Sequence, residues 1–325
     1  MKYTIFGESH GPAIGVTLSG VPAGLELDWD FIHSEMARRA PGQSAMTTAR
    51  KEADEPHVLS GVFGGKTTGA PLCAVIQNTD TRSKDYSKLK TCPRPSHGDY
   101  AGYVASGGCQ DYRGGGHFSA RLTAPLVFAG AVAKQILAQK GISVSARISM
   151  VGGVADPTPE QLEAAVLAAK ADRDSVGGAI SCTVTGFPAG LGAPDFGRNV
   201  EGIFSQYLFA VPAVKGVEFG AGFGFAHMRG SQANDPFYMD GSAVKTRTNH
   251  AGGINGGITN GMPVEFTVSI RPTPSISRDQ DTVELSTGEN VKLVIEGRHD
   301  PCILPRAVVV IEAAAALAAC EVLGI

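Results

Sequence analysis

The sequence lacks the features that mark secreted, disulfide-stabilised or membrane proteins. Its six cysteines are spread along 325 residues with no CxxC pair, so we expect reduced thiols in a cytoplasmic protein. No apolar run of signal-peptide length precedes Gly7, and we expect no secretion. The longest apolar stretches, 122–137 and 307–325, are interrupted by charges and fall short of a clean span. They predict buried core helices and no membrane partner.

Charge of one sign is also scarce. The chain has 28 Lys and Arg residues against 31 Asp and Glu residues, which gives a net charge of −3. No global cationic field is therefore present to hold a polyanion, and nucleic acid is not an expected partner. Hydrophobic residues make up 43% of the chain and charged residues 18%, which is typical of a globular protein with a sizeable core.

Several well-known catalytic patterns are missing. The glycine run at 114–116 stands before a helix predicted from Phe118 and resembles a phosphate cradle at a positive helix end, but no Gly-Lys-Ser/Thr follows it. Patterns of the GxGxxG and HExxH kinds are absent as well, and the one GxSxG match, GESHG at 7–11, leads into a predicted strand instead of a helix. The sequence thus predicts neither a P-loop, a dinucleotide fold, a metal site nor a serine nucleophile elbow.

What is present includes one internal repeat. Residues 17–25 read TLSGVPAGL and residues 183–191 read TVTGFPAGL. In each copy a strand-like run enters a Gly-x-Pro-Ala-Gly-Leu turn, and a predicted helix follows at 28–39 or 198–210. We interpret residues 1–325 as a single domain with two related βα halves, about 1–150 and 151–325. A common turn motif that arose twice is the alternative.

Periodicity predicts an α+β fold. Further helices are expected at 118–140, 158–170 and 306–323, the second with a capping box that starts at Thr158. Strands are expected at 14–19, 57–63, 72–77, 143–150, 179–185, 217–220 and 264–271. Several of them alternate in polarity, which favours antiparallel sheets with one covered face. Long stretches rich in Gly, Pro, Arg and His separate these elements at 40–54, 79–116, 225–261 and 271–298, and we expect them to be functional loops.

Histidine and arginine gather in those loops. Five of the eight histidines lie within two residues of a glycine in predicted loops: His10, His97, His117, His250 and His299. Arginines in or next to the same stretches include Arg39, Arg50, Arg94, Arg113, Arg121, Arg271, Arg298 and Arg306. A guanidinium group binds carboxylate and phosphate bidentately, so this pattern predicts an anionic small-molecule ligand. Solvated surface charges are the alternative.

Seven segments resemble the signature blocks of the chorismate synthase family. In chain order they are GESHG at 7–11, RPSHGDY at 94–100, DYRGGGHFSAR at 111–121, GVEFGAGF at 216–223, NHAGGINGGITNGMP at 249–263, RPTPSI at 271–276 and GRHDPC at 297–302. The resemblance covers effectively the whole chain. It implies a β-α-β sandwich of antiparallel sheets and helices, and a homotetramer. It also implies a shikimate-pathway lyase that eliminates phosphate from 5-enolpyruvylshikimate 3-phosphate and requires reduced FMN without consuming it.

The resemblance also implies roles for individual residues. His10 matches a family histidine near the substrate phosphate, His97 one beside the flavin, and Asp300 an acidic residue near flavin N5. Arg39 and Arg121 would meet the substrate. The matched flavin contacts are His117, Phe118, Ser119, Pro212, Ala213, Gly256, Arg271, Pro272, Thr273, Pro274, Ser275 and Arg298.

The chain departs from the family at several of its site positions. Ala40, Ala45, His117, Leu122, Pro212 and Arg271 stand where the family commonly has Arg, Arg, Arg, Glu, Asn and Lys, in that order. We expect these departures to affect how tightly substrate and flavin are held. A flavin redox protein with another substrate, and a non-catalytic protein that binds a phosphorylated metabolite, stay open as alternatives. Whether NAD(P)H reduces the flavin on this chain also stays open, although nothing resembles an added reductase domain.

Overall fold

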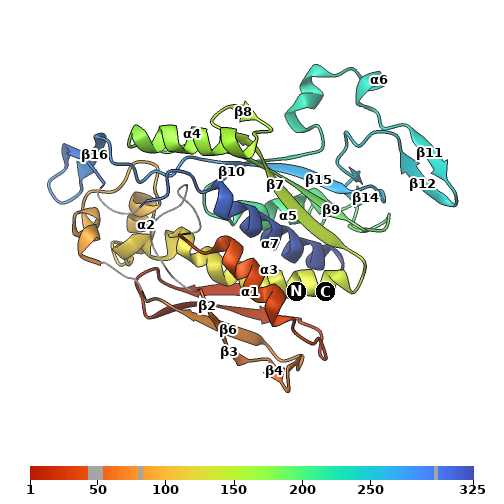
Figure 1. The fold of residues 1–325 in the computed structure, drawn as a ribbon, viewed down its shortest axis with the longest axis horizontal. Coiled ribbons are helices and arrows are strands. Elements are labelled where there is room, and N and C mark those ends of the chain that lie inside the picture. The colour runs from red at the N-terminus through yellow and green to blue at the C-terminus, as the bar shows by residue number, and fades with distance from the viewer. Residues whose placement is uncertain (43–53, 80–82, 296–298) are drawn as a thin grey trace.

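Two antiparallel sheets lie on either side of a layer of helices in the computed structural model of the chain (Figure 1). The structure describes residues 1–42, 54–79, 83–295 and 299–325. Antiparallel strands and helices in separate layers confirm the predicted α+β class. Each of the six cysteines is a free thiol. Within the described ranges no helix has the length and apolar character needed to cross a membrane.

The first sheet has the strand order β1-β2-β6-β3. Its strands are β1 (Lys2–Gly7), β2 (Ala13–Ser19), β6 (Leu72–Gln77) and β3 (Pro56–Ser60), and the hairpin of β4 (Val62–Phe63) and β5 (Lys66–Thr67) connects the last two in sequence. Alternate side chains of the central strands are buried, as in Ile14, Val16 and Leu18 of β2. Because side chains along a strand point alternately to the two faces of a sheet, one face of this sheet packs against the helices.

The second sheet has the order β10-β15-β9-β7-β8. Its strands are β10 (Val214–Phe219), β15 (Val264–Ile270), β9 (Gly178–Thr185), β7 (Ser143–Val151) and β8 (Val154–Ala155). Ile180, Cys182 and Val184 of β9 are buried at alternate positions. This sheet therefore also covers the helices with one face, as the alternating polarity predicts.

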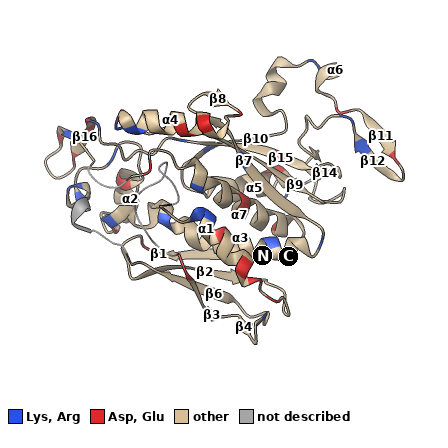
Figure 2. Cartoon of the chain, in the orientation of Figure 1, with Lys and Arg blue, Asp and Glu red and all other residues tan. Residues whose placement is uncertain are grey.

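The helical layer consists of α1 (Trp29–Arg39), α3 (Thr123–Ala138), α5 (Val200–Phe209) and α7 (Leu304–Val322). α3 and α7 approach closely at Gly130, where the absence of a side chain makes room for Ala313. A Cβ atom at Gly130 would lie only 2.2 Å from the Cβ of Ala313. Both helices are rich in alanine and almost fully buried, as the long apolar stretches predict. Charged residues of both signs nevertheless lie on these helices (Figure 2).

The remaining elements lie in the connections. They are α2 (Asp99–Ser106), α4 (Pro159–Ala171), α6 (Gly230–Ala233), the 3-10 segments η1 (Ser83–Lys90), η2 (Arg113–Phe118), η3 (Ala120–Leu122) and η4 (Gly222–His227), and the hairpins β11 (Phe237–Asp240) with β12 (Ala243–Thr246), β13 (Ile254–Asn255) with β14 (Ile258–Thr259), and β16 (Gln280–Glu284) with β17 (Glu289–Leu293). The segment with α6, β11 and β12 extends away from the two sheets in Figure 1.

Two predicted element boundaries are wrong for local reasons. The helix expected from Phe118 begins only at Thr123, because Ser119 is extended and Ala120–Leu122 forms a 3-10 turn. The strand expected at 57–63 is interrupted at Gly61, whose φ is +87°. Sequence reasoning also missed β1 and the β16–β17 hairpin. The capping box at Thr158 and the Asp28 cap of α1 are present as predicted.

The strands of the two sheets correspond in order. Taken along the chain, β1, β2, β3 and β6 occupy the same relative places as β7, β9, β10 and β15. α1 follows β2 as α5 follows β9, and α3 follows β6 as α7 follows β15. We call residues 1–142 the first half and residues 143–325 the second half, since β7 belongs to the second sheet and the boundary near residue 150 would cut it.

Candidate active site

One pocket lies where the helical layer meets the long loops of both halves. Arg39 ends α1, Ser119 and Arg121 lead into α3, Pro212 follows α5, and Arg306 lies in the first turn of α7. The lining residues are Arg39, Pro41, Tyr86, Arg94, His97, Gly98, Gly114, Phe118, Ser119, Ala120, Arg121, Pro212, Ala213, Arg271, Thr273, Pro274, Ser275, His299, Asp300, Ile303 and Arg306. Segments far apart in sequence therefore form one site.

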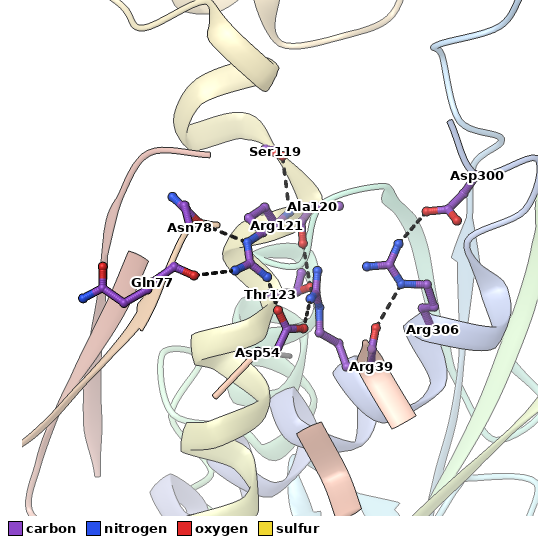
Figure 3. Close-up of polar contacts among 10 residues, drawn as sticks. All are labelled: Arg39, Asp54, Gln77, Asn78, Ser119, Ala120, Arg121, Thr123, Asp300 and Arg306. Carbon is purple, nitrogen blue, oxygen red and sulfur yellow. Dashed lines mark hydrogen bonds and ion pairs between the residues drawn. The ribbon is translucent and has the colours of Figure 1, made fainter. Parts of the chain in front are cut away.

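Two of the lining arginines share one buried carboxylate. Nη1 of Arg39 and Nη1 of Arg121 donate to the two different oxygens of Asp54 (Figure 3). Nε of Arg39 donates to Oγ1 of Thr123 at 3.2 Å, and Nε of Arg121 donates to Oδ1 of Asn78 at 3.1 Å. Each guanidinium is thus held at several of its nitrogens.

A third arginine extends this arrangement to the other side of the pocket. Nε of Arg306 donates to the backbone oxygen of Arg39 at 2.9 Å, and its Nη1 donates to Oδ2 of Asp300 at 2.6 Å. Figure 3 shows the resulting series, with Asp54 between Arg39 and Arg121 and with Asp300 beyond Arg306. Three guanidinium groups thereby face two carboxylates, which leaves this wall positively charged.

Burial strengthens the electrostatics of this wall. Burial lowers the pKa of the Arg39 guanidinium to about 10, and the charges of Arg306 and Arg121 add to this effect while Asp54 opposes it. Burial alone would raise the pKa of Asp54, but the charges of Arg39 and Arg121 outweigh it and hold that pKa below its ordinary value. Asp54 is therefore ionised at neutral pH, and a further anion would relieve the repulsion among the arginines.

A second buried group orients His97. Arg94 donates to both oxygens of Asp99, from Nε at 2.7 Å and from Nη2 at 2.8 Å. Hydrogen bonds from Arg94 and His97 outweigh burial and hold the pKa of Asp99 below its ordinary value. Oδ1 of Asp99 lies 2.6 Å from Nδ1 of His97. Nη2 of Arg94 lies 3.2 Å from the same Nδ1. Because the contact with the carboxylate is shorter and a carboxylate can only accept, we infer that Nδ1 carries a proton and that Nε2 is the titrating nitrogen of the ring.

The surroundings keep His97 neutral near pH 7. Burial lowers its pKa, the charge of Arg94 lowers it further, and Asp99 opposes both. His97 lines the pocket. A neutral imidazole with its orientation set by a carboxylate is an arrangement suited to proton transfer at Nε2.

His10 lies immediately behind the pocket wall. A Cβ atom at Gly114 would lie 2.5 Å from Nε2 of His10, so only glycine allows the imidazole to approach the wall at this point. The ring of His10 also meets the ring of Tyr86 edge-on, with centroids 5.1 Å apart. Gly114 and Tyr86 both line the pocket, and His10 is buried, so the β1–β2 loop delivers this side chain to the site.

The segment after β15 forms another wall. Arg271, Thr273, Pro274 and Ser275 line the pocket, and Oγ of Ser275 accepts a hydrogen bond from Nη1 of Arg94 at 3.1 Å. Oγ1 of Thr273 is buried with no hydrogen-bond partner in the described part of the chain. A buried hydroxyl without a partner at a pocket wall is available for a polar ligand.

Some predicted site residues lie elsewhere. Nδ1 of His117 is 3.0 Å from the backbone oxygen of Gly7, and this exposed residue does not line the pocket. Pro272 lines a hollow on the second sheet instead of the pocket. Gly256 lies in the β13–β14 turn, whose strand β14 is on the opposite side of Figure 1 from α2. Arg298 and Ala45 lie outside the described residues.

Sequence reasoning assigned no role to Asp54, Asp99 or Arg306. Asp99 stands two residues after His97 within the RPSHGDY block, so its proximity could have been used. Arg306 belongs to the loop arginines of the sequence, but its partner Asp300 becomes evident only when the start of α7 is in place. Asp54 carries no local signal, because its partners are 15 and 67 residues away.

The chemistry of the pocket is that of anion binding with proton transfer. Arginines provide fixed positive charge, and His10, His97 and Asp300 provide groups that can hold or move a proton. The described residues contain no group of His, Cys, Asp and Glu side chains able to hold a metal ion.

Comparison with known proteins agrees with the sequence resemblance. The family described as chorismate synthase matches residues 1–323. A protein named chorismate synthase from Chitinophaga pinensis is 48% identical over 98% of this chain and 92% of its own length. One of the same name from Dehalococcoides mccartyi is 44% identical over 96% of this chain and 92% of its own length.

A solved structure is also similar. It is titled a crystal structure of chorismate synthase, has 26% sequence identity and a TM-score of 0.73, and the match covers 99% of this chain and 91% of that one. The shared fold therefore extends over both halves.

Proposed function

The chain belongs to the chorismate synthase family and is a lyase of the shikimate pathway, and we propose that it converts 5-enolpyruvylshikimate 3-phosphate to chorismate by 1,4-anti elimination of phosphate. We propose further that reduced FMN is required without net redox change. The substrate has two carboxylates and a phosphate, and the flavin adds another phosphate. A pocket for these molecules has to provide fixed positive charge at more than one point.

The observation that carries this proposal is the series of three arginines in one wall. Arg39, Arg121 and Arg306 line the same pocket, and two carboxylates only partly neutralise them. The first turns of α3 and α7 lie beside them, and helix N-termini favour anions. A carboxylate or phosphate of the substrate would complete this charge balance.

The residues present also fit a flavin. Phe118, Pro212 and Pro274 offer flat apolar surface, while Thr273 offers the buried hydroxyl without a partner. Arg271 adds a positive charge at the same wall. When bound, reduced FMN supplies the transient electron donation that assists loss of phosphate and of the C6 hydrogen, which an ordinary side-chain base would not remove unaided.

The three candidate catalytic residues would divide the proton chemistry. His10, behind Gly114, would hold a proton against the departing phosphate and neutralise its charge. His97, oriented by Asp99, would take up a proton at Nε2 and supply it to the reduced cofactor, which maintains the charge state of that cofactor. Asp300, held by Arg306, would assist acceptance of the substrate hydrogen at flavin N5.

We also propose a cytoplasmic homotetramer. Gly256 matches a flavin contact of the family but lies away from the pocket of its own chain. If Gly256 meets flavin, a second copy must bring it there, which favours an oligomer over a monomer. Mass measurement in solution tests the assembly.

The decisive experiment is an anaerobic assay with photoreduced FMN and 5-enolpyruvylshikimate 3-phosphate. We expect chorismate and inorganic phosphate in equal amounts, with the flavin recovered in its reduced form. Absence of chorismate at saturating concentrations of both would contradict the proposal, and net flavin oxidation coupled to turnover would favour a redox protein instead. Replacing photoreduced FMN by oxidised FMN with NADPH tests whether the chain reduces its own flavin.

A further inference from the structure

We infer that Asp54 is a positioning residue for substrate binding, whose carboxylate sets the separation and orientation of the Arg39 and Arg121 guanidinium groups. This inference rests on the proposed function and concerns the same pocket. It assigns a role to a residue that does not line the pocket but holds two residues that do.

The first argument is the geometry of the bridge. Each oxygen of Asp54 accepts from a different arginine, so the carboxylate fixes both guanidinium groups with respect to one another. Its side chain has an exposed fraction of 0%, and those of Arg39 and Arg121 have 3% each. The bridge is therefore shielded from water, which makes its interactions stronger than those of a surface ion pair.

The second argument is which nitrogens the bridge leaves over. Arg39 uses Nε for Thr123 and Nη1 for Asp54, and within the described ranges its Nη2 has no partner. Arg306 uses Nε and Nη1, and in those same ranges its Nη2 also has none. Both residues line the pocket, so the anchored edges turn these donors to an incoming anion.

The third argument is that Arg121 has no comparable freedom. Its Nε donates to Asn78, its Nη1 to Asp54 and its Nη2 to the backbone oxygen of Gln77 at 3.3 Å. The Arg121 guanidinium is therefore held in place between the end of β6 and Asp54. Through Asp54 it also fixes the position of Arg39. Rigid support of this kind is what a site needs to hold a ligand within a fraction of an ångström.

A simpler role for Asp54 makes the opposite prediction. If the carboxylate were only a counter-ion, it would compete with the substrate anion for the same guanidinium groups. Removing its charge would then leave the site more positive and bind anions more tightly. If the carboxylate positions the arginines, removing it weakens anion binding despite the added positive charge.

The test compares Asp54→Asn with Glu312→Gln. Glu312 is a matched control because its buried carboxylate also joins two cations, Arg38 and Lys134, outside the pocket. Both variants should lower the melting temperature. Only Asp54→Asn should weaken equilibrium binding of 5-enolpyruvylshikimate 3-phosphate, by about tenfold to a hundredfold, with FMN affinity unchanged. Unchanged or tighter substrate binding by a folded Asp54→Asn protein would overturn the inference.

A second variant covers the case in which Asp54→Asn does not fold. Asp54→Glu keeps the charge but displaces the carboxylate by one methylene. Positioning predicts weaker substrate binding here too, with the Michaelis constant raised more than turnover is lowered, whereas a counter-ion role predicts wild-type binding. Wild-type affinity in Asp54→Glu would overturn the inference.

Failure of the proposed function can be recognised separately. The wild-type chain is assayed first, and if it neither binds nor converts 5-enolpyruvylshikimate 3-phosphate, that function is wrong. The same variants are then titrated with inorganic phosphate. Weaker phosphate binding in Asp54→Asn than in wild type supports the bridge, and equal or tighter binding overturns it.

Discussion

The sheet of the first half and the sheet of the second half share one strand order, but the connections between their strands differ. β1 and β2 are joined by the short loop that holds His10, whereas β7 and β9 are joined through β8 and the helix α4. At the end of the next helix the first half places Arg39 at the pocket, and after the corresponding helix the second half places Pro212 and Ala213 there.

The turns between these parts are alike in detail. The Gly24 amide donates to the backbone oxygen of Thr67 at 2.7 Å, and the Gly190 amide donates to that of Thr259 at 2.8 Å. In each half the threonine hydroxyl also accepts from the following leucine amide, at 3.0 Å and 2.9 Å respectively. The hydrogen bonds that hold each Pro-Ala-Gly-Leu turn are therefore the same in the two halves.

This contrast separates stability from chemistry. The strands and the Pro-Ala-Gly turns are used in the same way in both halves, and neither turn lines the pocket. The groups that could bind anions or move protons come from connections that the halves do not share, or from the helix ends next to those connections. We therefore expect substitutions in shared parts to change the free energy of unfolding, and substitutions in the unshared connections to change turnover.

The largest effect is expected from the histidines of the first half. His10→Ala and His97→Ala should each lower turnover by about a hundredfold or more, the usual scale for a positioned acid or base. The assay is anaerobic turnover with photoreduced FMN, with circular dichroism to check the fold. Near-wild-type turnover in either variant would remove that histidine from the mechanism.

The connection in the second half provides the control. Thr158 caps α4, which stands where the first half has the His10 loop. Thr158→Ala should destabilise the fold by about 1 kcal/mol and leave turnover unchanged. A large loss of turnover in this variant would mean that the two connections do not differ in role.

The next effect concerns Asp99, which raises the pKa of His97 against burial and Arg94. Asp99→Asn removes that influence, so the pKa of His97 should fall further and the ring should take up its proton at lower pH than in wild type. NMR titration of the His97 ring in flavin-free protein measures this shift. A pKa that stays the same or rises would contradict the role of Asp99.

The same variant should change stability in one pH range. The pKa of Asp99 is lower in the folded chain than in the unfolded one, so its contribution is complete above the unfolded value of about 3.9 and is lost as the pH falls below it. Asp99→Asn should therefore differ from wild type in free energy of unfolding at pH 7, and the difference should shrink in acid. A difference that grows in acid would show another cause.

How much of this was visible in the sequence depends on the range of each interaction. Hydrophobic period and caps are local, and they predicted α1, α4, β2 and β9 closely. The internal repeat was also visible, although only in part: residues 64–71 (GGKTTGAP) and 256–263 (GGITNGMP) form a second matching pair that supplies Thr67 and Thr259. Because this second pair is far in sequence from the first, the sequence alone does not show that the two pairs hydrogen-bond to each other.

The site was less predictable because its contacts are not local. The family motifs pointed to His97, Arg39 and Asp300, which the fold gathers at one pocket. They could not indicate that Asp54 joins Arg39 to Arg121, since that bridge depends on how β6, α1 and α3 meet. Nor could they indicate that Gly256 would lie away from the pocket of its own chain.

The shared turns give a prediction of intermediate size. Thr67→Val and Thr259→Val keep the side-chain shape but remove the hydroxyl that accepts from Leu25 or Leu191. Each leaves a buried amide without that partner and should cost about 1 to 3 kcal/mol in the free energy of unfolding. Urea denaturation measures the free energy of unfolding of both variants. The two losses should differ by no more than about 1 kcal/mol.

Turnover at saturating substrate is the control for these threonines. Both variants should keep it, because neither residue lines the pocket. If one variant loses stability and the other does not, the two turns contribute differently to the free energy of unfolding despite their matching hydrogen bonds.

The smallest effect is expected where the halves differ by a single methyl group. A proline is followed by a residue with positive φ after each helix: Gly42 at +82° after α1, and Ala213 at +73° after α5. Glycine adopts this conformation freely, whereas alanine pays about 1 kcal/mol for it. Ala213→Gly should therefore raise the free energy of unfolding by up to about 1 kcal/mol, while Gly42→Ala should lower it by at least as much.

Because the backbone oxygen of Ala213 accepts from the Arg271 amide at 3.0 Å beside the pocket, the strain is located where flavin would bind. Measuring FMN affinity along with urea denaturation then tells whether the alanine serves the site: weaker FMN binding in a more stable Ala213→Gly protein would show that it does, and unchanged binding would show that the strain is incidental.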